Sequence, residues 1–151
     1  MAQQKEAIST INSLIETLKD GEKGFKEASE AVRDPQLKSL FQQYSQQRQR
    51  FAGELQVQAQ GLGEAKPEKS SSTAGAMHRT WINLKSAVTS GDDKAILSEC
   101  ECGEDSAVHE YEEAMNDGLS GTAREVVARQ FTEIKSAHDR VKQLRDTAKK
   151  T

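Results

Sequence analysis

Apolar side chains recur at spacings of three and four residues over four long stretches of the chain. In the first stretch the repeating positions are Ile8, Ile11, Ile15, Leu18, Phe25 and Val32, which predicts a helix over about residues 4–33. Asp34 and Pro35 then supply an N-cap and a first helical residue, so a second helix should run over about 35–60. A junction this short predicts an antiparallel hairpin of two helices.

A polar segment separates this hairpin from the second half of the chain. Residues 61–75 collect Gly, Pro, Lys and a Ser-Ser-Ser-Thr run, which is typical of an exposed linker. Helical spacing then returns in a short element over about 76–90 and in two long ones over about 92–117 and 122–149. We therefore expect residues 1–151 to form one all-α domain, a ferritin-like four-helix bundle of two hairpins whose long crossover carries a short fifth helix.

Charge and hydropathy exclude several classes of partner. Acidic and basic residues are interspersed along the whole chain and leave a formal net charge of -3, so no basic surface for nucleic acid is predicted. No stretch approaches the roughly 20 apolar residues of a membrane span, and no secretory signal begins the chain, so we expect a cytoplasmic protein. The two cysteines, Cys100 and Cys102, are expected to be buried and reduced.

Each of the four long apolar patterns is interrupted once, near its middle, by a polar residue that keeps the helical spacing. These residues are Glu22, Arg48, Glu104 and His138. Because residues three and four apart share one face of a helix, all four side chains are predicted to point into the core. Unpaired charges are too costly there, so they should meet in one buried layer with Arg48 bound to a carboxylate.

Four short segments carry a family resemblance: residues 14–17 (LIET), 20–25 (DGEKGF), 103–105 (GED) and 137–141 (AHDRV). Through them, and over about residues 8–145, the chain resembles an uncharacterised bacterial family of ferritin-like four-helix bundles that is distantly similar to rubrerythrin-type proteins. That family has no established activity. The resemblance therefore implies the fold and does not imply a reaction.

The polar residues only partly match the di-iron site of ferritin-like bundles, which takes one Glu from each of two helices and a Glu-x-x-His pair from each of the others. Glu22, Glu104 and His138 match three ligands and are the candidates for a mononuclear Fe, Mn or Zn site. Arg48 stands where a second histidine belongs, and its guanidinium can bind carboxylates in place of a cation.

Two functions stay open from the sequence. The first, which we favour, is a non-catalytic structural or stress-associated interaction protein without a cofactor. The alternative is a degenerate mononuclear metal-binding oxidoreductase that uses Fe, Mn or Zn. Ala, Leu and Met outside the core positions, together with Trp81 on the crossover, suggest a homodimer. No residue is predicted to be catalytic, and whether the chain is an enzyme stays open.

Overall fold

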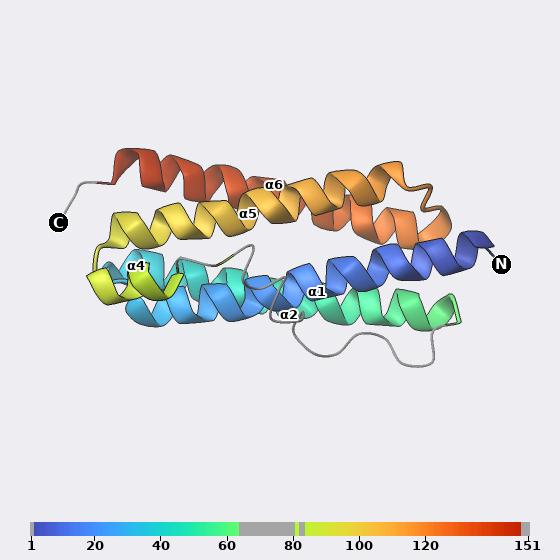
Figure 1. Ribbon diagram of the computed structural model, residues 1–151, viewed down its shortest axis with the longest axis horizontal. Coiled ribbons are helices and arrows are strands. Elements are labelled where there is room, and N and C mark those ends of the chain that lie inside the picture. The colour runs from blue at the N-terminus through green and yellow to red at the C-terminus, as the bar shows by residue number, and fades with distance from the viewer. Residues whose placement is uncertain (1, 64–80, 82–83, 149–151) are drawn as a thin grey trace.

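Four long helices make up most of the molecule, as Figure 1 shows. The computed structural model describes residues 2–63, 81 and 84–148. The helices are α1 (Ala2–Ala31), α2 (Pro35–Gly61), α4 (Leu84–Ser90), α5 (Asp93–Asn116) and α6 (Gly121–Thr147). The all-α helical bundle predicted from the sequence is confirmed. Residues 64–75 of the predicted linker, and residues 76–80 of the predicted short helix, lie outside the described part of the chain.

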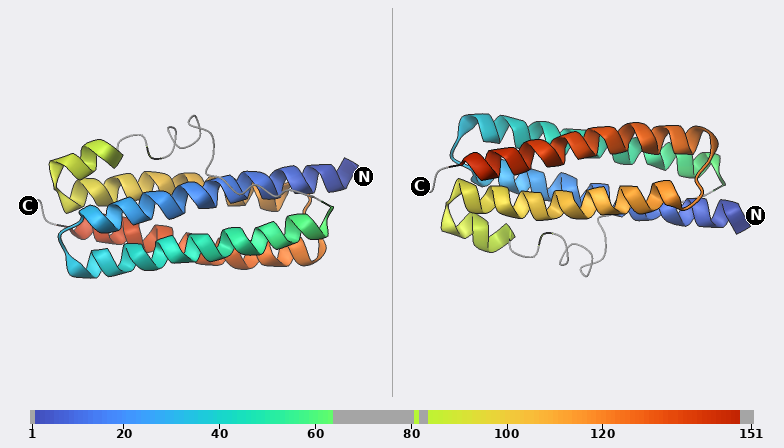
Figure 2. Two further views of the ribbon diagram at one scale, coloured as in Figure 1. Left: turned by 90° about the horizontal axis from the view of Figure 1, so that it is seen from below. Right: turned by 90° about the horizontal axis from the view of Figure 1, so that it is seen from above.

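The long helices form two hairpins that pack side by side (Figures 1 and 2). Helix α1 packs on α2 within the first hairpin and on α5 of the second, while α6 packs on α5 and α2. The four helices therefore stand at the corners of a square in cross-section, and α2 lies diagonally opposite α5. The short α4 covers the junction of α1 and α5 at the end of the crossover.

Aspartate side chains fix the starts of α2 and α5 and connect them. Asp34 caps α2 by accepting a hydrogen bond from the backbone N–H of Gln36 at 2.8 Å, and Asp92 caps α5 in the same way through Lys94 at 3.0 Å. Asp93 has a different role. Its two carboxylate oxygens accept the backbone N–H groups of Arg33 at 2.8 Å and of Asp34 at 3.0 Å, which ties the turn of the first hairpin to the start of α5.

The apolar interior is divided into two clusters along the length of the bundle. One cluster, near the start of α1, contains Ile11, Leu14, Ile15, Leu18, Leu55, Tyr111 and Val127 among others. The other, near the α1–α2 turn, contains Phe25, Phe41, Trp81, Ile96, Leu97 and Val141 among others. The faces turned away from these clusters carry charged residues. Within the described residues, no helix is long and apolar enough to cross a membrane.

Trp81 from the crossover is inserted between α1 and α5, where two helical glycines leave room for its ring. A Cβ atom at Gly24 would lie 2.6 Å from the indole, and one at Gly103 would lie 2.4 Å from it, so neither position could carry a side chain without displacing the ring. The edge of the indole also meets the ring of Phe25, with centroids 5.5 Å apart. Only 5% of Trp81 is exposed, so it belongs to the core and does not offer the surface contact that the sequence suggested.

Candidate functional site

A buried ion pair joins α2 to α5 across the diagonal of the bundle, between the two apolar clusters. Nη1 and Nη2 of Arg48 donate hydrogen bonds to Oε1 and Oε2 of Glu104 at 2.5 and 2.7 Å. Arg48 is 1% exposed and Glu104 is 0% exposed. The prediction that Arg48 binds a carboxylate in the core is therefore confirmed, and both oxygens of Glu104 are occupied.

The surroundings of Arg48 keep it charged and fix its orientation. Its Nε donates to Oε1 of Gln47 at 3.1 Å, and its guanidinium carbon lies 5.2 Å from the centroid of the Phe25 ring. Burial lowers the pKa of Arg48, but the charge and hydrogen bonds of Glu104, together with Tyr111 and Tyr44, raise it, and the net shift is upward. The side chain of Arg48 packs against α1 at Gly21, where a Cβ atom would lie 3.5 Å from Cγ and Nη1 of Arg48.

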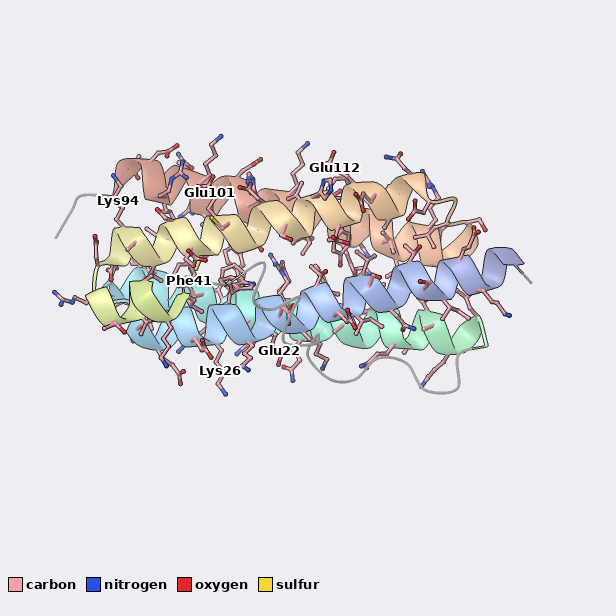
Figure 3. All side chains as sticks on the ribbon, viewed as in Figure 1. Glu22, Lys26, Phe41, Lys94, Glu101 and Glu112 are labelled. Carbon is pink, nitrogen blue, oxygen red and sulfur yellow. The ribbon has the colours of Figure 1, made fainter. Side chains whose placement is uncertain are left out.

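Glu22 does not join the buried ion pair, which corrects the predicted four-residue layer. Its side chain is half-buried on α1, and Figure 3 shows it on the side of the molecule formed by α1 and α2. The interior position at this level is the neighbouring Gly21, which is buried. Its backbone carbonyl accepts a hydrogen bond from the hydroxyl of Ser45 of α2 at 2.8 Å.

His138 lies at the edge of the interface between α5 and α6 and also stays apart from the buried ion pair. Its Nδ1 contacts Oδ1 of Asp139 at 3.1 Å, its Nε2 contacts Oδ1 of Asp105, and 16% of its side chain is exposed. Burial lowers the pKa of His138, whereas the hydrogen bonds to Asp139 and Asp105 raise it, and the net shift is upward. The buried neighbour Ala137 takes the interior position instead.

The three predicted metal ligands are therefore not brought to one point. Glu104 is bound to Arg48, Glu22 is half-buried on α1, and His138 faces Asp105. Among the described residues, the group of potential ligands that does come together is Glu101, Asp105 and His138, whose ligand atoms all lie within 4.8 Å of one another. We call this group the outer triad.

A second set of buried hydrogen bonds, which joins α6 to α5 and α2, was not predicted from the sequence. Gln130 of α6 is fully buried and accepts the hydroxyl of Tyr111 at 2.7 Å, while its Nε2 donates to the carbonyl of Phe51 at 3.2 Å and to Oε1 of Glu54 at 2.9 Å. Burial is the main cause of a raised pKa of Tyr111, so its hydroxyl stays protonated and acts as a donor. Gln130 follows the inward residue Val127 by three positions, so helical periodicity could have predicted that its side chain points into the core.

The two cysteines differ in their access to solvent. Cys100 is buried, as expected, but Cys102 is exposed, which corrects the prediction that both are buried. Burial and the carboxylate of Glu104 raise the pKa of Cys100 well above its usual range. Partial burial and the carboxylate of Glu99 raise the pKa of Cys102. Because the thiolate is the reactive form, both thiols should be less reactive near neutral pH than a free cysteine.

We expect iodoacetamide to modify Cys102 alone in the native protein, and to do so slowly at neutral pH. The rate should rise with pH, because a raised pKa keeps the thiol protonated until more alkaline conditions. Cys100 should be modified only when the bundle opens, for example in urea. Mass spectrometry of peptides after timed alkylation measures both rates, with the Cys102→Ser variant as the control for assignment. Rapid native modification of Cys100 would contradict the closed core.

Comparisons with known proteins place the chain in a family without a described activity. A family model described as a domain of unknown function, DUF2383, matches residues 6–117. The matched segment begins within the first turns of α1, contains α2, α4 and α5, and includes both partners of the buried ion pair, whereas α6 with His138 lies beyond it. Among curated proteins no match was found.

Proposed function

The chain belongs to the DUF2383 family, and we propose that it is a non-catalytic, ferritin-like bundle that acts as a structural or stress-associated interaction protein in the bacterial cytoplasm. The observation that carries this proposal is the bidentate contact between Arg48 and Glu104 in the centre of the bundle. A guanidinium placed there supplies the positive charge that a metal ion supplies in a catalytic ferritin-like protein. A cation entering the same layer would meet repulsion from Arg48.

The burial of the pair also supports a structural role. Both side chains lie between the two apolar clusters and are at most 1% exposed, so a substrate could reach them only if the helices separated. A catalytic metal needs an open coordination position for water or substrate. The two hydrogen bonds from Arg48 occupy the oxygens of Glu104 that such a metal would use.

Aerobic addition of Fe(II) tests this proposal against the alternative of a mononuclear Fe, Mn or Zn oxidoreductase. We expect the protein to oxidise Fe(II) no faster than buffer, and the Glu104→Gln variant to behave identically. Glutamine keeps the size of the side chain and can still accept a hydrogen bond from Arg48. Catalysed oxidation that Glu104→Gln abolishes, in a variant with an unchanged helical circular dichroism spectrum, would overturn the proposal.

The partner that we propose for the interaction role is a second copy of the chain. Half-buried apolar side chains, including Val108, Val126 and Phe131, flank the core cluster near the start of α1, and Val57 of α2 is 62% exposed. These side chains leave apolar surface that a dimer could cover. Sedimentation equilibrium should give twice the monomer mass at micromolar concentrations, and a monomer mass there would remove the homodimer from the proposal.

A further inference from the structure

The outer triad combines ligand types that suit a divalent metal. Glu101 and Asp105 are four residues apart on α5 and so share one face of the helix. His138 approaches them from α6, and its Nε2 is directed at Asp105. Two carboxylates and one imidazole with room for water are typical ligands of Zn²⁺, Mn²⁺ and Fe²⁺.

Glu101 is an unusual residue for a solvated helix face, because it is only 7% exposed. Its Oε2 forms an ion pair with Nη1 of Arg145 of α6. This oxygen already has a cationic partner, so a metal ion could bind Glu101 only by displacing Arg145. Arg145 also binds the Asp146 carboxylate with Nε and Nη2, so it would keep a partner if a metal displaced it from Glu101.

The imidazole is oriented in the manner of a metal ligand. Asp139 contacts Nδ1 of His138 at 3.1 Å, which leaves Nε2 as the nitrogen that faces Asp105. A carboxylate behind a ligating histidine fixes its tautomer and increases its basicity. Only 16% of the His138 side chain is exposed, so the ring has little freedom to turn away.

We propose that Glu101, Asp105 and His138 bind one divalent transition-metal ion of the Zn²⁺ class on the outer side of the α5–α6 hairpin. The ligand atoms need only small side-chain rotations to close around an ion, since they already lie within 4.8 Å of one another. The ion would link α5 to α6 near the middle of the bundle. This site is separate from the buried Arg48–Glu104 pair, and binding there requires no redox reaction.

Calorimetric titration of the full chain with Zn²⁺, after removal of metals by a chelator and dialysis, tests the site. We expect one ion per chain and a loss of affinity of about tenfold or more in both His138→Gln and Asp105→Asn, which each remove a ligand. Arg145→Gln should instead bind Zn²⁺ more tightly, because it removes a cation that competes for Glu101. A purely structural role of the triad would not produce this gain.

Two matched variants control for other ligands. His109 is an exposed histidine of α5 that contacts Glu113 at 2.9 Å, and Cys102 is the exposed thiol next to Glu101. His109→Gln and Cys102→Ser should bind Zn²⁺ as the unmodified chain does, and circular dichroism should show that all variants keep their helices. Absence of Zn²⁺ binding, an unchanged affinity in His138→Gln, or loss of binding in Cys102→Ser would each overturn the proposal.

Discussion

Replacing Arg48 with alanine should lower the free energy of unfolding by roughly 3–5 kcal/mol, because the substitution leaves a buried carboxylate without its partner. Glu104 is 0% exposed, and both of its oxygens depend on the guanidinium of Arg48. Urea denaturation followed by circular dichroism measures the change. Of the substitutions considered, this one is expected to have the largest effect on stability.

Removing both charges together should be far less damaging. In the Arg48→Met, Glu104→Leu double variant the pair is replaced by apolar side chains of similar length, which is often neutral or stabilising in a protein interior. Arg129 supplies a control of the same residue type, since its ion pair with Glu54 at 3.0 Å is largely exposed. Arg129→Ala should change stability by about 1 kcal/mol or less. An equal loss in Arg48→Ala and Arg129→Ala would contradict the burial of the Arg48–Glu104 pair.

The second large effect is expected at Gly103, where alanine should destabilise the bundle by roughly 1–3 kcal/mol. Alanine favours a helix over glycine by about 1 kcal/mol, so helix propensity alone predicts the opposite sign. The steric clash should outweigh this gain in helix propensity, because the new Cβ would lie 2.4 Å from the Trp81 ring. Thermal unfolding measures the stability, and the fluorescence of Trp81, the single tryptophan of the chain, should shift to longer wavelength as the ring is displaced.

Gly21→Ala is the matched control for this prediction. It is also a buried helical glycine, but a Cβ there meets Arg48 at 3.5 Å, which is an ordinary van der Waals contact. We expect this variant to be as stable as the unmodified protein or up to about 1 kcal/mol more stable. Destabilisation by Gly21→Ala equal to that by Gly103→Ala would show that backbone effects, and not the tryptophan, determine both results.

Apolar spacing was sufficient to predict the helices but not which of two adjacent residues enters the core. Between Leu18 and Phe25 the inward step can pass through Gly21 or Glu22, since three plus four and four plus three residues complete the same two turns. The sequence favoured Glu22 because glycine has no side chain that marks an inward position. In the structure Gly21 lies inside, next to the side chain of Arg48, and Glu22 remains half-buried.

The same ambiguity accounts for the misplacement of His138. From Ile134 to Val141 the inward step passes through the buried Ala137 and not through His138, which moves one position toward the flank. Arg48 and Glu104 were placed correctly, since both are buried, but the same ambiguity was present on α5, where the neighbouring Gly103 is also buried and packs on Trp81. The contact of His138 with Asp105 could not be predicted from periodicity, because it joins the flanks of two helices whose rotation depends on packing.

The diagonal position of the Arg48–Glu104 pair also has a consequence for how the two hairpins align along their lengths. Most interior positions hold aliphatic side chains, and a slide of one hairpin by one helical turn, about 5.4 Å, would exchange many of them for similar ones. The slide would also bring Cys100 or Val108 opposite Arg48, because these residues lie one turn to either side of Glu104 on α5. Both charges would then be buried without partners, which is far less favourable than any mismatch among aliphatic groups. We infer that the pair adds little to the stability of the native bundle. Its main effect is to disfavour slipped bundles, which an entirely apolar core would tolerate.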